Sequence, residues 1–366
     1  MRDGAIKDRW PRSVPVVGVG LVLALGMFGA GCGGDDDDGG TGPTDDSGVD
    51  TSPGTDSGKD SGTDSTTDSG TDAGDTADTG PLGPGTLGTT TKVANDPTKF
   101  TSPFDATLDP TGATVYFTAI APDGTGAVFS VPAAGGTVTK LASAGALIAP
   151  FGIAISTDGK TLFIADVAAG ADLGAIYTLP IAGGTPALLA GTDGLTPRSL
   201  ETSGTDLYFT GIESGGSPAL MKIPAAGGTV ATVAKGDPFR DPSGLAVTKS
   251  GDVYVVDTVG AGSRRANILK VSGGAATEFV SNVVVGYPAG LTLSQDESAL
   301  ELSGLDPVLG TDSVFRIVIA TKASTAFTKD IATFTESAGM HRAKNADTYA
   351  WVDSTAAGGT VYVLSK

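Results

Sequence analysis

The stretch PFGIAISTDGKTLFIADVAAGADLGAIYTLPIAGGTPALLA, residues 150–190, decides the fold of this chain. It opens with a proline turn and holds three short runs of aliphatic, aromatic and β-branched residues, FGIAI, TLFIAD and AIYTLP, before a Gly-Gly turn leads into a fourth run. Turn residues separate these runs, which is the pattern of antiparallel strands joined by hairpins. The stretch therefore predicts four short strands and no helix.

The same unit recurs along the chain at nearly constant intervals. Successive copies open 47, 47, 45 and 46 residues apart, and a degenerate sixth copy, SAGMHR, begins at Ser337. The clear copies open at Pro103, Pro150, Pro197, Pro242 and Pro288. Units of this length with four antiparallel strands are typical of propeller blades. The repeat predicts an all-β fold, a six-bladed β-propeller of four-stranded blades over residues 88–366.

The two ends of the repeat region complete each other. The sixth copy reaches Lys366 after only three strands, whereas GTTTKVA at residues 88–94 matches GTVTKLA at residues 136–142, in the fourth strand of the first copy. We expect residues 88–95 to supply the missing strand of the last blade, because an open sheet edge would invite aggregation.

Three motifs in the repeats resemble the six-bladed propellers of the NHL, gluconolactonase-like and TolB-like group. They are the strand starts GIAI and GLAV (residues 152–155 and 244–247), the Asp-ended strands LFIAD and VYVVD (162–166 and 253–257), and NILKV (267–271). The resemblance implies the same architecture. It leaves the activity open, because this fold carries lactonases, lyases, receptor modules and plain scaffolds.

The first 32 residues predict export. Residues 1–12 are basic, residues 13–31 are uncharged and mostly apolar, and small residues lead directly into Cys32, the only cysteine. This is the composition of a secretory signal peptide. The junction resembles the lipobox of bacterial lipoproteins, with Gly29 where that family prefers Leu. The resemblance implies lipidation of Cys32 and, because Gly33 follows it, an outer-membrane location; a cleaved signal with an incidental cysteine is the alternative.

Residues 33–87 predict a disordered linker. Residues 33–80 contain 14 Asp, one Lys and no aromatic residue, so burial cannot offset the entropy lost on ordering. From Asp56 to Asp72 an Asp recurs at every fourth position, and no Glu closes a loop, unlike a typical calcium loop. Calcium binding and O-glycosylation of this segment both stay open.

Composition narrows the function classes. The formal net charge of −18 is the sum of +2 in residues 1–32, −13 in residues 33–80 and −7 in residues 81–366. One Cys and one His exclude a disulfide scaffold, a Cys-ligated metal site and a thiol enzyme. The absence of clustered Lys and Arg argues against a nucleic-acid partner. The expected partners are the membrane, through the N-terminal lipid, and a protein or small-molecule ligand, with the propeller monomeric.

The first strand of each copy is expected to line the central channel. One slot, two residues after the usual Gly, holds Thr107, Ala154, Glu201, Ala246, Thr292 and His341, whereas the preceding positions are apolar and predict inter-blade core. Glu201 and His341 belong to the third and sixth copies, so a six-fold ring places them opposite each other. Asp105 replaces the usual Gly, and Arg198 and Arg342 bring charge to the same level.

Two interpretations of these groups stay open. In the first, Glu201, His341 and Asp105 form a polar pocket for acid–base catalysis or a metal ion. In the second, they are charge pairs or bind channel water, which satisfies buried polar atoms. The gluconolactonase-like resemblance implies a Glu, an Asn and an Asp converging on a divalent cation such as calcium. Glu201 and Asp105 match two of these ligands, but no Asn occupies the channel slot.

Other recurring residues predict structural roles. Asp166, Asp257 and Asp353 end the second strand in three copies, and pseudo-equivalent sites cannot all be catalytic, so we expect them to bond turns. The Gly-Gly pairs lack the Lys-Ser/Thr of a phosphate loop and predict hairpin turns.

We therefore expect a lipid-anchored envelope protein whose propeller is a non-catalytic binding or scaffold module. The ligand-binding candidates are Glu201, His341, Arg198, Asp105, Thr107 and Thr292. The alternatives are a metal-dependent hydrolase or lactonase with its site in the central channel, and an ancillary part of an envelope complex.

Overall fold

The computed structural model describes residues 89–143, 147–169, 173–259, 264–306, 311–326, 337–354 and 359–365. The predicted signal peptide, Cys32 and the linker of residues 33–87 lie outside the described residues. Every regular element in the described ranges is a β-strand, and none of these ranges holds a helix with the length and apolar character that a bilayer crossing requires.

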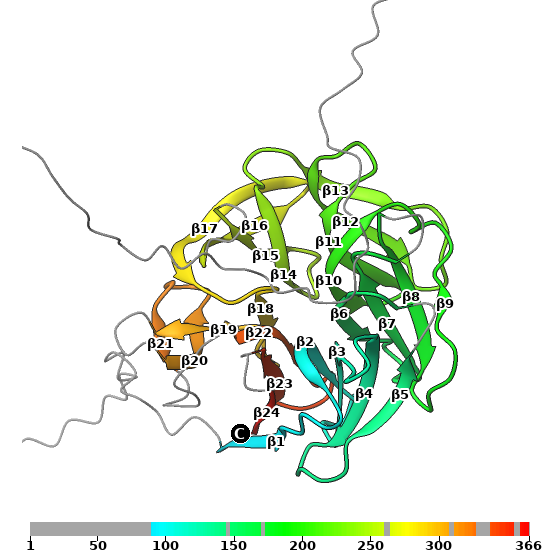
Figure 1. Cartoon of the computed structure of the whole chain (residues 1–366). Coiled ribbons are helices and arrows are strands. Elements are labelled where there is room, and N and C mark those ends of the chain that lie inside the picture. The colour runs from blue at the N-terminus through cyan, green and yellow to red at the C-terminus, as the bar shows by residue number, and fades with distance from the viewer. Residues whose placement is uncertain are drawn as a thin grey trace, which may run out of the picture. The chain divides into compact units, whose positions relative to one another are not determined.

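The strands form six antiparallel sheets of four strands, arranged around a common axis (Figure 1). Blade 1 consists of β2 (Thr101–Leu108), β3 (Thr114–Ile120), β4 (Gly126–Pro132) and β5 (Thr139–Ser143). Blade 2 consists of β6 (Pro150–Ile155), β7 (Thr161–Asp166), β8 (Ala175–Pro180) and β9 (Ala187–Leu188). Blade 3 consists of β10 (Thr196–Ser203), β11 (Asp206–Ile212), β12 (Pro218–Pro224) and β13 (Ala231–Lys235).

The remaining blades repeat this order of strands. Blade 4 consists of β14 (Asp241–Val247), β15 (Val253–Thr258), β16 (Arg265–Ser272) and β17 (Ala275–Val284). Blade 5 consists of β18 (Gly290–Leu293), β19 (Ala299–Asp306), β20 (Thr311–Val318) and β21 (Ser324–Ala326). Blade 6 consists of β22 (Ser337–Arg342), β23 (Thr348–Asp353), β24 (Thr360–Ser365) and β1 (Thr89–Ala94). The predicted six-bladed propeller is confirmed.

The last blade takes its outer strand from the start of the described chain. β1 pairs antiparallel with β24, with Thr90 opposite Leu364 and Lys92 opposite Tyr362. This is the strand expected from the similarity of residues 88–94 to residues 136–142. The pairing covers the outer edge of blade 6 and joins the two ends of the ring.

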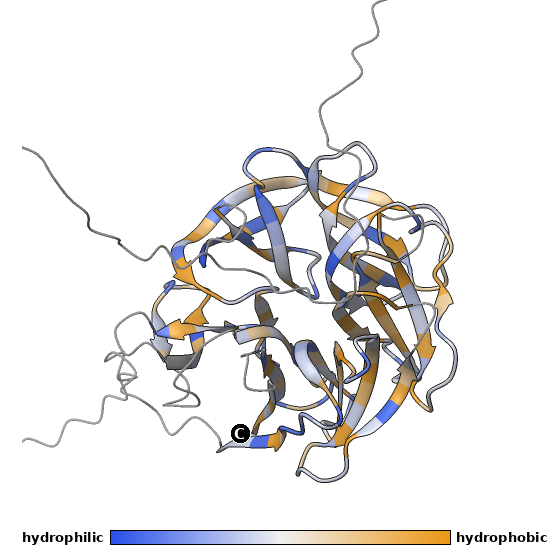
Figure 2. Cartoon of the chain, in the orientation of Figure 1, coloured by the Kyte–Doolittle hydropathy of each residue, from blue (hydrophilic) through white to orange (hydrophobic). Residues whose placement is uncertain are grey.

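The first strand of each blade lies at the axis. β2, β6, β10, β14, β18 and β22 contact one another in a closed ring. β6 is buried along its whole length, whereas the outer strand β9 is exposed and the outer strand β17 contains only exposed and half-buried residues. Figure 2 shows apolar residues running along the strands, with more polar loops between them. Most side chains of the first strands are therefore buried.

The core is divided among the interfaces between neighbouring blades. The buried apolar residues form six clusters, one for each interface in the ring. The positions predicted as inter-blade core are at most 1% exposed: Ala106, Ile153, Leu200, Leu245, Leu291 and Met340. Their burial agrees with the alignment of the six copies.

The Gly-Gly pairs occupy hairpin turns, as predicted. Gly135 and Gly136 have φ angles of 82° and 141°, and the pair Gly183 and Gly184 repeats this with 86° and 136°. Residues with a Cβ rarely adopt these angles, so the backbone of the turns accounts for the glycines and no phosphate-binding role is needed.

The Asp residues that end the second strands also have structural roles. Asp166 accepts hydrogen bonds from backbone N–H groups at residues 148, 149, 168 and 169 and thereby ties two loops together.

Candidate functional site

Three ionisable side chains meet at the axis of the ring. His341 on β22 lies between Asp105 on β2 and Glu201 on β10. Its Nε2 is 3.2 Å from Asp105 Oδ2, and its Nδ1 is 3.3 Å from Glu201 Oε2. All three residues are buried, with exposed fractions of 3%, 1% and 9% for His341, Asp105 and Glu201. The histidine therefore forms a bridge across the channel between blades 1 and 3.

Asp105 also fastens the inner strands to each other. Its Oδ1 accepts the N–H of Ala106 at 2.8 Å, and its Oδ2 accepts the N–H of Ile153 on β6 at 3.0 Å. The carboxylate lies against Gly339 of β22, where an added Cβ would come within 1.9 Å of Asp105 Oδ1. Glycine at that position makes room for the Asp105 side chain, and both oxygens of this carboxylate already accept hydrogen bonds.

Glu201 has a second cationic partner that the sequence reasoning missed. The Nζ of Lys344 forms an ion pair with Glu201 Oε1 and donates a hydrogen bond to the carbonyl of Thr202 at 3.0 Å. The N–H of Thr202 also donates to Glu201 Oε1, at 2.9 Å. Lys344 lies in the turn after β22, three residues beyond His341. No pattern in the repeats marks it, because the turns differ between copies in composition and length.

These contacts fix the charges of the cluster. Burial alone would lower the pKa of His341, but the Asp105 and Glu201 carboxylates outweigh burial and raise this pKa to about 10. Burial alone would raise the pKa of Glu201, but Lys344 and His341 outweigh it and lower this pKa to about 2. The position of His341 between two carboxylates favours its imidazolium form at neutral pH, in which each ring N–H would donate to one carboxylate.

The cluster does not fit a divalent metal ion. A metal ion needs ligands whose lone pairs converge on one point. The Asp105 oxygens accept backbone N–H groups, and Lys344 sits on Glu201. Across the described ranges, no group of three or more His, Cys, Asp or Glu side chains is arranged to hold a metal ion. The gluconolactonase-like ligand set implied by the family resemblance is therefore not assembled at this axis.

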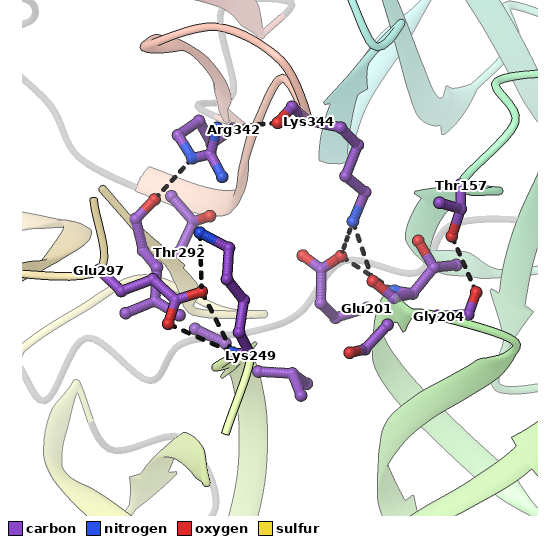
Figure 3. A pocket seen from close by; sticks show the side chains of 13 residues that line it. Thr157, Glu201, Gly204, Lys249, Thr292, Glu297, Arg342 and Lys344 are labelled. Atoms are coloured by element: carbon purple, nitrogen blue, oxygen red, sulfur yellow. Dashed lines mark hydrogen bonds and ion pairs between the residues drawn. The ribbon is translucent and has the colours of Figure 1, made fainter. Parts of the chain in front are cut away.

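A cavity of about 220 Å³ opens beside Glu201 at one mouth of the channel (Figure 3). It lies at the end where the first strands turn into the second strands, and five blades contribute to it. Its lining residues are Thr157, Glu201, Thr202, Ser203, Gly204, Ala246, Val247, Lys249, Thr292, Leu293, Glu297, Arg342 and Lys344. Glu201 and Thr292 are thus the predicted ligand-binding candidates that this cavity brings together.

The charged residues of the cavity are held by neighbouring blades. Glu297, in the turn after β18, accepts the backbone N–H of Lys249 at 3.1 Å and lies 3.7 Å from the Nζ of that lysine. Arg342 donates from Nε to the carbonyl of Leu293 at 2.9 Å. These bonds join the turns of blades 4, 5 and 6 and give the cavity a fixed polar wall.

The other predicted candidates lie elsewhere. Arg198, near the start of β10, forms an ion pair with Asp241 and lies over the ring of Tyr287, with 5.3 Å from its Cζ to the ring centroid. Thr107 is 2% exposed on β2 and does not line the cavity. The sequence placed both residues at the level of Glu201, but the structure gives Arg198 partners at the opposite end of the inner strands.

Comparisons with known proteins establish the fold and no more. No protein-family model matches the chain, and no curated protein matches its sequence. Among solved structures, aldose sugar dehydrogenase from Streptomyces coelicolor, in its PQQ-bound form, has 15% identity and a TM-score of 0.54 over 77% of this chain and 99% of that chain. A gluconolactonase from Xanthomonas campestris has 18% identity and a TM-score of 0.50 over 73% and 87%. The chain thus has the same six-bladed propeller fold as these enzymes. A shared fold does not imply the same residues at the axis or the same activity.

Proposed function

We propose that this protein is an exported, lipid-anchored envelope protein whose propeller is a non-catalytic module that binds a ligand in the mouth cavity. The predicted signal peptide and the lipobox-like position of Cys32 support the location, as does a linker composition suited to a tether. The closed ring supports the module, because it presents the turns of five blades around one polar cavity.

The observation that carries the non-catalytic role is the mutual pairing of Asp105, His341, Glu201 and Lys344. A general base needs a free lone pair near the operating pH, and a general acid needs a pKa near that pH. The pKa of His341, about 10, keeps the imidazole protonated at neutral pH, so it is not available as a general base. The pKa of Glu201, about 2, keeps the carboxyl group ionised, so it is not available as a general acid. Their charges stabilise the axis instead.

The first experiment compares turnover with binding in the full chain. A panel of lactones and esters, assayed with calcium, zinc or manganese, should give no turnover above that of the Glu201→Gln variant. Saturation-transfer NMR against a mixture of sugars, sugar acids, amino acids and dipeptides should detect a bound component. Ser203→Trp fills the cavity from its half-buried rim and should abolish that signal. Metal-dependent turnover that Glu201→Gln removes would overturn the proposal in favour of the lactonase.

A second experiment tests the membrane anchor. Cys32→Ser removes the only thiol that could take a lipid, so the protein should move from the membrane fraction to the soluble envelope fraction. Ser47→Ala, in the linker, is the matched control and should stay in the membrane fraction. Unchanged membrane retention of Cys32→Ser would rule out lipidation as the anchor and leave the propeller's role untouched.

A further inference from the structure

The mouth cavity holds a cation whose charge no carboxylate balances. Arg342 donates from Nε to Leu293 O and from Nη1 to the carbonyls of Ala343, Lys344 and Ala346. In the part of the chain that the structure describes, no carboxylate forms an ion pair with this guanidinium. Carbonyl oxygens fix its orientation but leave its positive charge in place, and Nη2 donates to none of the described residues.

The other charges of the cavity are paired. Lys344 is held by Glu201, which His341 also contacts, and Lys249 forms a looser pair with Glu297 at 3.7 Å. The Lys249 side chain is 81% exposed, so its ammonium can turn toward an incoming ligand. The lining carries three cations against two carboxylates, in a region of the chain that is acidic as a whole. The cavity therefore differs in charge from its surroundings.

Size and lining narrow the ligand further. A volume of about 220 Å³ lies below the roughly 300–1,000 Å³ of most small-molecule pockets, so the cavity suits a ligand of the size of a single sugar acid or amino acid. Among the described residues, no aromatic side chain lines the cavity, so a neutral sugar would find no described ring on which to stack. Ala246, Val247 and Leu293 contribute apolar atoms to the lining.

Resting on the proposed binding role, we infer that the cavity takes a small ligand through an anionic oxygen group, a carboxylate or a phosphate. The Nη2 of Arg342 is the fixed donor to this anion, and Lys249 is the adaptable second cation. A planar guanidinium suits both oxyanions and is held with little loss of entropy when its other nitrogens are already bound. The hydroxyl of Thr292 lies in the same lining and completes a polar site.

The test is isothermal titration of the full chain at low salt with glucuronate, with glucose and with inorganic phosphate. Glucuronate and glucose share a ring and differ in the carboxylate. If the site takes a carboxylate, glucuronate should bind at least about tenfold more tightly than glucose, and phosphate should compete with glucuronate. If the site takes only phosphate, phosphate should bind and glucuronate should not. Equal affinity for glucuronate and glucose would overturn the anion inference while leaving a binding module. The anion inference would also be overturned if neither glucuronate nor phosphate bound while the NMR screen still detected a neutral ligand whose signal Ser203→Trp abolishes.

Single-residue variants distinguish the loss of a cationic ligand contact from a loss of folding. Arg342→Gln should weaken the preferred anion by about tenfold or more, and Lys249→Gln, at an exposed site with little risk to the fold, should weaken it less. Arg240→Gln is the matched control, because this exposed arginine precedes β14 at the opposite end of the inner strands. Unchanged affinity in both cavity variants would contradict the proposal. If Arg342→Gln does not fold, Arg342→Lys keeps the charge, and Lys249→Gln alone decides the outcome.

Discussion

At the scale of single residues, the axis concentrates charge in a place where most blades present Gly, Ala or Thr. Asp105, Glu201 and His341 are each buried, and burying any one of them alone would be costly. Together they satisfy one another, and Lys344 balances the second carboxylate. The cluster is stable only as a set, so removal of one member leaves an unpaired buried charge.

The sequence predicted part of this cluster. Alignment of the copies placed Glu201 and His341 opposite each other and marked Asp105 as an exception to Gly, because the period of the repeat fixes which strand positions face the axis. It could not place Lys344, since a turn residue is oriented by local backbone geometry that the repeat does not preserve. It also misplaced Arg198, whose long side chain reaches Asp241 rather than the axis.

The first prediction concerns His341 and pH. A raised pKa means that the stability contributed by His341 is complete below its ordinary value of 6.5 and is lost as the pH rises to about 10. The free energy of unfolding of the full chain should therefore fall over this range by roughly 2 to 4 kcal/mol more than that of His341→Gln. At pH 6 the variant should be less stable than the wild type by about 3 kcal/mol.

The measurement is urea unfolding at a series of pH values. The difference between wild type and variant removes the contributions of other titrating groups, including Asp257, whose pKa burial raises to about 6. At acid pH the free energy of unfolding should instead decrease as the pH falls. The pKa of Glu201 is lowered, so its contribution to stability is lost between pH 4.5 and about pH 2. Parallel curves for the two proteins above pH 6.5 would argue that His341 is neutral in the folded state.

At the scale of elements, the close approach of the inner strands depends on glycine. A Cβ on Gly152 of β6 would lie 2.1 Å from the Arg198 carbonyl of β10, and one on Gly244 of β14 would lie 2.4 Å from the Ala289 carbonyl just before β18. Both contacts are with backbone, which cannot move without shifting a blade. The G-[LI]-A-[VI] starts seen in the sequence are therefore explained by packing between blades.

The second prediction follows from this contact. Gly152→Ala should destabilise the propeller by several kcal/mol, because a methyl group would overlap the backbone of the next blade. Gly215→Ala is the control, since only the flexible Glu213 side chain lies within 3.0 Å of a Cβ there. Thermal unfolding of both variants measures the effect. Equal melting temperatures would mean that the first strands can spread without cost.

At the scale of the whole molecule, the ring is fastened by a strand from the other end of the repeat region. β1 adds the fourth strand to blade 6, and Val93 and Ala94 join the cluster between blades 6 and 1. The sequence could predict this closure because one blade lacked a strand and one orphan strand matched it. It could not predict the mouth cavity, whose shape depends on turns that differ from copy to copy.

The third prediction tests the closure. Deleting residues 87–95 should expose the edge of β24 and lower the melting temperature by roughly 10 °C or more, with oligomers forming through the open edge. Deleting nine residues of the linker, 50–58, is the control of equal length and should leave melting unchanged. Light scattering after size exclusion gives the oligomeric state. A monomer with the wild-type melting temperature after the first deletion would show that β1 is dispensable.

We propose that the charged residues at the axis have a structural role, and the protonation state of His341 tests this proposal most directly. Because the chain has a single histidine, ¹⁵N-histidine labelling of the full chain gives one pair of ring signals, which can be followed with pH by NMR. We predict imidazolium shifts that stay constant from pH 5 to 8 and a midpoint near the pKa of about 10. A midpoint at or below the ordinary value of 6.5 would contradict the account and return the axial residues to acid–base chemistry.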